Sequence, residues 1–437
     1  MLKRKKLLLI SIPTLIIFIF IIFTSSTKNE PFHHISKKQL YKDTVTNILS
    51  YSLENIDENF LAWVNQEYSY EVLAKLEKNL KENTYTPNTW HQLTSNSLIV
   101  LQDKYNNITS SKIRELTSKK NNEITLNFIG DVSLADNWYI MPKYDERGKK
   151  IHGILSPEVV NTIKSADIGV ANNEFTISDR GTKMPKKYYT FRGSPNRLSI
   201  YEEMGINLLT LANNHIYDFG ETAFNDSIDT LTQYNIPYIG AGKNIEEAKE
   251  PFYYIVNGYK IAFVNATRAE KFILTPEATQ TTGGILRCYD PTTFINVISE
   301  AKKQSDFVIA LIHWGKEDSS QLEQVQIDTS KQYIDAGADL IVGTHAHTLQ
   351  GIDFYNNKAI IYNLGDFIFN NETKDTAIFT LKIDNDGNFK YYFIPCLEKE
   401  EYTSLLTGTE KERVLNKIRN LSPNITINKD GEFYKNN

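Results

Sequence analysis

The sequence predicts an α/β layered fold for the part of the chain from Glu123 onward. Short apolar runs rich in β-branched residues alternate there with segments of helical periodicity. The helical segments begin and end at recognisable capping residues, and polar side chains with metal-binding chemistry follow the central apolar runs. Together these observations predict a sheet-based domain whose functional residues lie at strand ends.

The predicted strands are the apolar runs, which are too short for typical helices and are bounded by turn residues. In chain order they cover residues 124–129, 167–171, 207–211, 253–257, 260–266, 307–312, 340–343 and 359–364. A final hairpin is expected over 378–396, because the tripeptide Asn385-Asp386-Gly387 separates two strand-like segments.

The predicted helices lie between these strands and cover residues 156–166, 194–205, 224–235, 290–304 and 319–337. Ser156 suits the N-cap and Pro157 suits the first helical position. The pair Ser194-Pro195 repeats that signal, and Gly205 ends the helix that follows it. A shorter helix is expected near the C-terminus, over 409–422.

The N-terminus predicts a membrane anchor. Residues 3–6 are basic, and residues 7–23 are apolar and uncharged. A spanning helix needs roughly 20 such residues, with about 17 as the lower limit. Because basic residues stay on the cytoplasmic side, we expect residues 1–27 to be an uncleaved anchor that leaves the rest outside. The alternative is a cleaved signal peptide and a secreted protein, although no A-x-A site follows the apolar run.

Residues 28–121 are polar with helix-like apolar spacing, which predicts a helical extracytoplasmic segment. The expected organisation is therefore an anchor over 1–27, a helical segment over 28–121 and an α/β domain over 122–437. The two cysteines, Cys288 and Cys396, lie far apart in the chain. Their pairing stays open, since the composition is not that of a disulfide scaffold.

Composition and charge argue against some functions. Apolar residues make up 41% and charged residues 23%, the values of an ordinary globular protein. The net charge of −5 argues against a nucleic-acid binder, which would carry a basic stripe. The chain contains no G-x-x-x-x-G-K-[ST] loop, which argues against ligation powered by ATP bound to this chain.

Carboxylates, carboxamides and imidazoles follow most of the central strands. They are Asp131, Asn173, Glu174, Asn213, Asn214, His215, His313, His345, His347, Asn363 and Asp366. In open α/β sheets, ligands bind beyond the carboxyl ends of the strands. Imidazole together with carboxylate and amide oxygen suits Zn, Mn or Fe rather than Ca, which prefers oxygen alone.

Each of these residues also has a purely structural explanation. A Gly-Asp pair after a strand is often only a turn, and asparagine tolerates left-handed backbone in loops. The coincidence of such features at corresponding strand ends favours one shared site. For Asp366 and Asn173 taken singly, both explanations stay open.

The motifs carry a family resemblance. The stretches "GDVSL", "ANNEF", "FRGSP", "LLTLANNHIYDFG", "IHWGKE", "GADLIVGTHAHTLQG" and "YNLGDFIF" occur in the order and approximate spacing of the bacterial CapA family. The resemblance covers residues 123–370. That family is named after capsule synthesis, including poly-γ-glutamate capsule, and it is similar to the calcineurin-like metallophosphatases. The resemblance therefore implies a two-sheet α/β sandwich with a dinuclear metal centre.

The resemblance also implies a role for each residue. The implied metal ligands are Asp131 and His347 on the first metal, Glu174 bridging both metals, and Asn214, His313 and His345 on the second. His215 would be the general acid, with Asp218 orienting its ring. Arg192, Asn173, Asn213 and Asp366 are the candidates for binding substrate. The cofactor would be one or two Mn, Zn or Fe ions per chain.

This chain departs from the related patterns at several positions. Ser133 stands where metallophosphatases usually have a histidine ligand, and Asp366 stands where asparagine is commoner. Thr344 and Ala346 replace a histidine and a proline, while both presumed ligands beside them are kept. The added carboxylate of Asp366 is able to replace the missing ligand or to alter substrate choice. The number of metals therefore stays open.

Two functions follow as expectations. The first is a membrane-anchored, outward-facing, metal-dependent hydrolase of phosphoesterase type that acts in capsule, poly-γ-glutamate or other cell-surface polymer synthesis. The second is a non-catalytic polymer-binding or assembly component of a capsule synthesis or export complex. The expected partners are an anionic polymer or phosphoester substrate, the membrane, and other capsule-synthesis membrane proteins, without nucleic acid.

Overall fold

The computed structural model describes residues 112–120, 122–270 and 274–436. The predicted anchor over 1–27 and nearly all of the predicted helical segment over 28–121 lie outside these residues. Within the described ranges, no helix has the length and apolar character needed to cross a bilayer.

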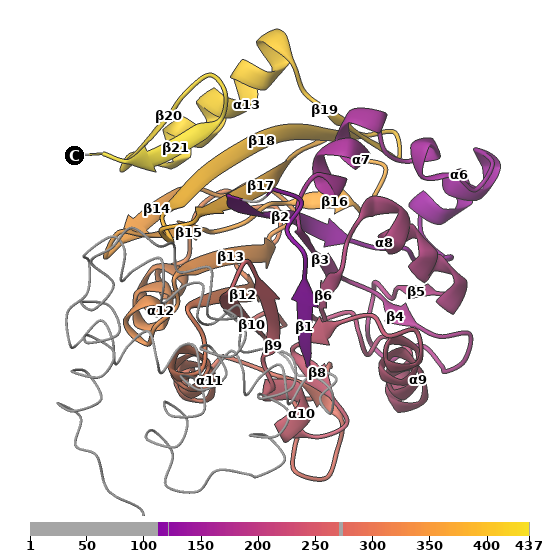
Figure 1. Ribbon diagram of the computed structural model, residues 1–437. Helices are drawn as coiled ribbons and strands as arrows, with labels where there is room; N and C mark the ends of the chain where they lie inside the picture. Colours follow the sequence, from indigo (N-terminus) through magenta and orange to yellow (C-terminus); the bar gives the residue numbers. More distant parts are fainter. Residues whose placement is uncertain (1–111, 121, 271–273, 437) are drawn as a thin grey trace, which may run out of the picture. The chain divides into compact units, whose positions relative to one another are not determined.

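Two β-sheets dominate the described part of the chain (Figure 1). The first holds, in spatial order, β1 (Ile113–Leu116), β9 (Phe252–Val256), β10 (Tyr259–Thr267), β12 (Phe307–Trp314), β13 (Leu340–His345), β15 (Lys358–Ile361) and β14 (Ile352–Tyr355). Strands β10, β12, β13 and β15 run parallel, so their carboxyl ends lie at one edge.

The second sheet is mixed. Its order is β20 (Ile425–Ile427), β21 (Glu432–Lys435), β18 (Phe389–Lys399), β17 (Lys374–Asp384), β2 (Glu123–Val132), β3 (Ile168–Asn173), β6 (Leu208–Thr210) and β7 (Tyr238–Ile239). In addition, β16 (Asp366–Ile368) pairs with β2, and β19 (Tyr402–Leu405) pairs with β18. Strands β2, β3, β6 and β7 are parallel, so they also end at one edge.

The sheets pack face to face. One buried cluster joins Phe128 and Val170 of the second sheet to Phe263, Ile309 and Val342 of the first. Because side chains alternate along a strand, these residues form the inner faces of a sandwich. The prediction of an α/β fold is thereby confirmed.

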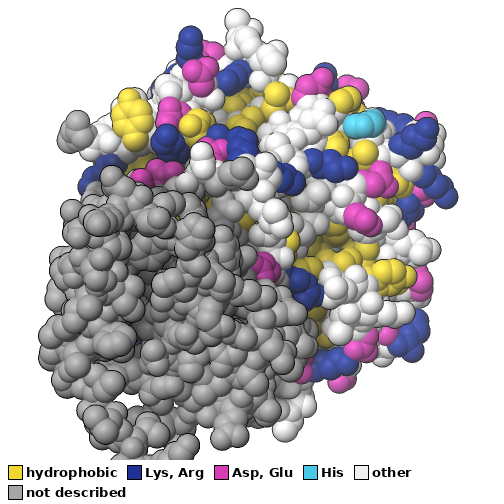
Figure 2. Space-filling view, in the orientation of Figure 1, with side chains coloured by type: hydrophobic (Ala, Val, Ile, Leu, Met, Phe, Trp, Pro, Cys, Tyr) yellow, Lys and Arg dark blue, Asp and Glu magenta, His cyan; other side chains and the backbone are white. Residues whose placement is uncertain are grey.

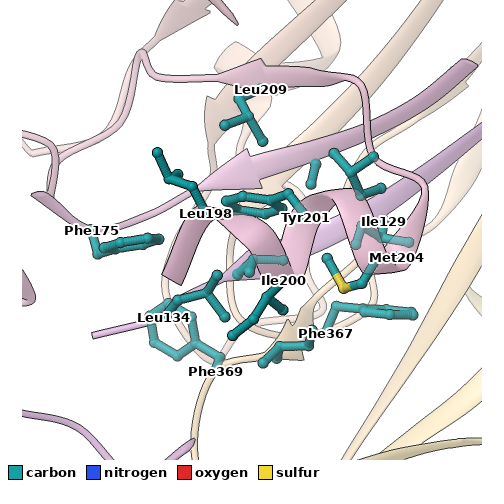
Figure 3. Packing of buried hydrophobic residues seen from close by; sticks show 14 of the residues in the cluster. Ile129, Leu134, Phe175, Leu198, Ile200, Tyr201, Met204, Leu209, Phe367 and Phe369 are labelled. Atoms are coloured by element: carbon teal, nitrogen blue, oxygen red, sulfur yellow. The ribbon is translucent and has the colours of Figure 1, made fainter. Parts of the chain in front are cut away.

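Helices cover the outer faces of the sandwich (Figure 1). They are α6 (Ile140–Glu146), α7 (Pro157–Lys164), α8 (Ser199–Met204), α9 (Gly220–Gln233), α10 (Ile245–Lys249), α11 (Thr292–Lys303), α12 (Gln324–Asp335) and α13 (Gly408–Leu421). A second buried cluster packs α8 against the outer face of β2 and β6, as Figure 3 shows around Tyr201, Met204, Ile129 and Leu209.

Short elements complete the connections. They are the 3-10 turns η1 (Ile151–Gly153) and η2 (Pro195–Leu198) and the paired strands β4 (Thr176–Ile177) with β5 (Arg192–Gly193) and β8 (Ala241–Gly242) with β11 (Gly284–Ile285). The helix predicted over 194–205 is therefore a 3-10 turn followed by α8, which ends at Gly205 in left-handed backbone with φ 79°.

The predicted strands, the hairpin and the remaining helices match observed elements, with one exception. Strand β1 lies at the C-terminal end of the segment over 28–121, so the helical prediction is wrong for Ile113–Leu116. These residues pair with β9 in parallel, and this long-range pairing decides their conformation. Both cysteines, Cys288 and Cys396, are buried and free.

Close backbone contacts bring the strand ends together. A Cβ atom on Gly130 would lie 1.8 Å from the carbonyl oxygen of Gly365, and one on Gly343 would lie 1.9 Å from that of Tyr362. Only glycine permits these approaches. They place the end of β2 beside the start of β16, and the end of β13 beside the end of β15.

Candidate metal centre

The structure gathers the predicted ligands where the parallel strands of both sheets end. Asp131 lies near the end of β2, and Glu174 directly follows β3. His313 lies on β12 and His345 ends β13. The loop after β6 brings Asn214 and His215 to the same place, where Asn214 contacts His313.

Asp131 and Glu174 form the centre of the site. Both are fully buried, and the Nδ2 atom of Asn172 donates to Asp131 Oδ1 at 2.8 Å and to Glu174 Oε2 at 3.0 Å. Burial raises the pKa of Asp131 and, together with the nearby charge of Asp131, raises the pKa of Glu174 well above its usual range. Two carboxylates held together without water are stabilised by a cation between them.

The imidazoles of His313 and His345 are held in the form that binds metals. His313 Nε2 lies 2.8 Å from Asn214 Oδ1 and 3.7 Å from Glu174 Oε1. Its Nδ1 atom lies 2.9 Å from the hydroxyl of Thr344. Burial and neighbouring imidazoles hold the pKa values of His313 and His345 well below the usual range. Neutral imidazole is the ligand form, so ligation here requires no loss of a proton.

Unpaired buried atoms indicate that the site fits a metal. Glu174 Oε1 and His345 Nδ1 are buried without a hydrogen-bond partner. Leaving such atoms unpaired is costly, and coordination would satisfy them. Three overlapping groups have ligand atoms within 4.8 Å of one another: Asp131 with Glu174 and His313, Glu174 with His345 and His347, and Asp131 with His347 and Asp366. Asp131, Glu174 and His347 are each shared by two of these groups.

His347 connects the two carboxylate partners of the first predicted metal position. Its Nδ1 atom lies 2.7 Å from Asp366 Oδ1 and 3.5 Å from Asp131 Oδ2. Although burial acts in the opposite direction, the charge and hydrogen bond of Asp366, with the charge of Asp131, raise the pKa of His347 to about 9. His345 and His347 both have positive φ, 94° and 53°. Backbone strain of this kind is characteristic of functional sites.

Asp366 lies inside this cluster. It faces Asp131 across the β16–β2 pair, and its Oδ2 atom accepts a hydrogen bond from Asn370 Nδ2 at 2.8 Å. Ser133, at the position of the missing histidine, is buried with an unpaired hydroxyl. The geometry therefore suits Asp366 to metal ligation, the alternative that the sequence left open beside substrate binding.

His215 forms a dyad with Asp218 beside the centre. Its Nδ1 atom lies 2.7 Å from Asp218 Oδ2, and its Nε2 atom lies 3.9 Å from Glu174 Oε1. Burial lowers the pKa of His215, although Asp218 partly offsets that effect. The backbone N–H of Phe191 also donates to Asp218 Oδ2, at 2.6 Å. Asp218 thus fixes the ring so that Nε2 faces the carboxylates.

Lys187 forms an ion pair with the Asp218 carboxylate of the dyad. Its side chain is only 7% exposed, and Nζ lies 2.7 Å from Asp218 Oδ1 and 3.1 Å from Glu270 Oε1. The same Nζ donates to the backbone oxygen of Asn214. The buried ammonium group of Lys187 therefore contacts Asp218 of the dyad, the predicted metal ligand Asn214 and Glu270.

The other predicted substrate-binding residues hold the surrounding loops. Asn173 accepts from the Tyr201 hydroxyl and donates to a backbone oxygen, so both ends of its amide are engaged. Asn213 accepts from two backbone N–H groups of its own loop, including that of His215. Arg192 donates to the backbone oxygen of Arg180 at 2.9 Å and stacks on an aromatic ring. These contacts give them structural roles in the described conformation.

Sequence reasoning missed Asn172, Lys187 and Thr344 as parts of the site. For Asn172 a signal was present: residues i and i+2 of a strand face the same side, so Asn172 points with Glu174 while Asn173 points away. No local pattern identifies Lys187, because its acidic partners lie in distant segments.

Comparisons with known proteins match the part of the chain that contains this site. The family model described as bacterial capsule synthesis protein PGA_cap matches residues 125–371, which include every residue of the three ligand groups. The chain is 29% identical to the PGA biosynthesis protein CapA of Bacillus subtilis over 278 residues, 62% of this chain and 71% of the relative. It is 28% identical to the capsule biosynthesis protein CapA of Bacillus anthracis over 312 residues, 69% of this chain and 74% of the relative. A probable polyglutamine synthesis accessory protein of Mycobacterium tuberculosis is 26% identical over 214 residues, 47% of this chain and 56% of the relative.

Proposed function

This chain belongs to the bacterial capsule synthesis protein family PGA_cap, and on that premise we propose that it is a metal-dependent hydrolase of phosphoesterase type. It would act in the synthesis of capsule, poly-γ-glutamate or another cell-surface polymer. Relatives are named for capsule and PGA biosynthesis, which supports the polymer as the setting. The single observation that carries the hydrolase is the set of buried, unpaired ligand atoms on Glu174 and His345 beside the His215 dyad.

The buried acidic and histidine residues would bind the metal. The residues that would hold the metal are Asp131, Glu174, Asn214, His313, His345 and His347, with Asp366 beside them. When bound, the metal supplies Lewis-acid chemistry for a phosphoryl group. We keep Mn, Zn and Fe as the candidate ions because the donor set mixes imidazole and carboxylate.

His215 would transfer the proton in the proposed reaction. Since Asp218 occupies Nδ1, the Nε2 atom is left to hold or move a proton toward the leaving oxygen of the substrate. Lys187 and the Phe191 N–H keep Asp218 in place during that step. Burial of the dyad limits competition from bulk water.

The test is elemental analysis of the purified full chain followed by assays on phosphomonoesters and phosphodiesters. We expect one or two Mn, Zn or Fe ions per chain, loss of metal in the His345→Ala/His347→Ala double variant, and loss of activity with metal retained in His215→Asn. A folded chain that takes up no metal when metal is offered would contradict the hydrolase.

A second candidate is a non-catalytic polymer-binding or assembly component of a capsule synthesis complex. The name of the Mycobacterium tuberculosis relative, a synthesis accessory protein, favours it. Metal binding without turnover of any phosphoester, combined with co-purification of other capsule-synthesis membrane proteins, would support this candidate.

We also propose that residues 1–27 anchor the chain in the membrane and leave residues 28–437 outside the cytoplasm. The basic residues 3–6 and the apolar residues 7–23 support this topology. Protease treatment of intact cells should digest residues 28–437, whereas an inward-facing chain would be protected until the membrane is broken. A shortened N-terminus in the mature protein would indicate cleavage and secretion instead.

A further inference from the structure

The loop between β4 and β5 combines exposed cations with exposed aromatic rings. Lys183 and Lys186 are exposed, and none of the ion pairs found among the described residues includes them. Tyr188 is 89% exposed and Tyr189 is 54% exposed, although large apolar rings normally lie in the core. Figure 2 shows hydrophobic side chains exposed among basic and acidic ones on the face over β4 and β5.

This loop is fixed directly on the proposed catalytic dyad. The backbone N–H of Met184 donates to the backbone oxygen of Asp218 at 2.8 Å, and Lys187 reaches the Asp218 carboxylate. Because its inner side is held in this way, the loop presents its outer residues as a fixed surface, not as a free tether.

Ring contacts continue from that surface to the site. Tyr188 contacts Tyr189 with ring centroids 4.8 Å apart, and Tyr189 contacts Trp138 at 5.9 Å. Trp138 contacts Phe191 at 4.9 Å, and Phe191 contacts the His215 ring at 4.4 Å. These contacts therefore link the exposed rings of the loop to the dyad through the buried ring of Phe191.

We propose that Lys183, Lys186, Tyr188 and Tyr189 bind an anionic polymer whose carboxylates are separated by methylene groups, and direct it toward His215. The ammonium groups would pair with the carboxylates, and the ring faces would pack against the methylene stems. Among the other charges of the loop, Arg180 is paired with Asp226, and Asp179 is the one exposed carboxylate.

The choice of polymer rests on the proposed function, but the binding surface is testable without turnover. Binding of poly-γ-glutamate to the full chain is measured by calorimetry in low and high salt, with neutral dextran as the comparison polymer. Lys183→Gln/Lys186→Gln should weaken binding about fivefold at low salt, with little difference at high salt, because surface charges are screened. Tyr188→Ala/Tyr189→Ala should weaken binding by a similar factor at both salt concentrations.

Matched controls are present in the same chain. Lys149 and Lys150 are also exposed, and Lys149 shares the positive φ of Lys186, so Lys149→Gln/Lys150→Gln removes the same charge elsewhere. Tyr234→Ala/Tyr434→Ala removes two other exposed rings. Wild-type affinity in both loop variants, an equal loss in the controls, or equal affinity for dextran would overturn the proposal. If the polymer binds through this loop while no phosphoester is hydrolysed, the hydrolase fails and the binding surface stands.

Discussion

Replacement of Lys187 by methionine should destabilise the protein strongly, because it removes the cation between two buried carboxylates. Without Lys187, Asp218 Oδ1 would have no partner among the described residues. Removing one partner of a buried ion pair typically costs about 3–5 kcal/mol, since the other charge stays buried and uncompensated. Asp218 is fully buried, whereas the Glu270 side chain is 12% exposed and can recover some hydration. We therefore expect a loss of about 3 kcal/mol, at the lower end of that range.

The assay is urea denaturation of the chelator-treated full chain, so that bound metal does not contribute to stability. Lys183→Met serves as the control, because Lys183 is exposed in the same loop and should change stability by no more than about 0.5 kcal/mol. Lys187→Arg should retain part of the stability, since it keeps the charge. A loss below about 1 kcal/mol in Lys187→Met, with an unchanged slope, would refute the argument that this cation compensates the carboxylates.

Three further changes test separate features of the structure. Gly343→Ala should lower the free energy of unfolding by at least about 2 kcal/mol and lower metal uptake, because its Cβ would lie 1.9 Å from the Tyr362 oxygen. Urea denaturation and elemental analysis measure the two effects, and an unaffected variant would show that this contact relaxes freely. Asn172→Leu should weaken metal affinity about 10- to 100-fold by freeing both carboxylates, as a metal titration would show, whereas wild-type affinity would remove Asn172 from the site. Burial acts to raise the pKa of Asp375, but the hydrogen bonds and charges of Arg413 and Lys417 together lower it from its usual 3.8. The contribution of Asp375 to stability is therefore present above that value and is lost as the pH falls through the lowered pKa. Asp375→Asn should therefore be less stable than wild type at pH 6 and approach it as the pH falls below the lowered pKa, and a pH-independent difference would contradict this sign.

The order of the helices and strands was predictable because it depends on the spacing of apolar residues along the sequence. The runs that form β2, β12 and β13 are mostly apolar and buried along nearly their whole length, as expected for strands covered on both faces. Strand β1 was not predictable in this way, because the four residues Ile113–Leu116 become a strand by pairing with β9.

The ligand types and their places at strand ends follow from the sequence, since the order of the chain sets which residues come after each buried strand. The sequence thus identified Asp131, Glu174, His313 and His345 and the chemistry that they share. Which neighbours complete the site depends on how distant segments fold together. The Asn172 amide is shared between Asp131 and Glu174, and Lys187 meets Asp218 and Glu270 from separate loops. Such contacts depend on how distant segments pack, and burial gives them their strength because water no longer screens the charges.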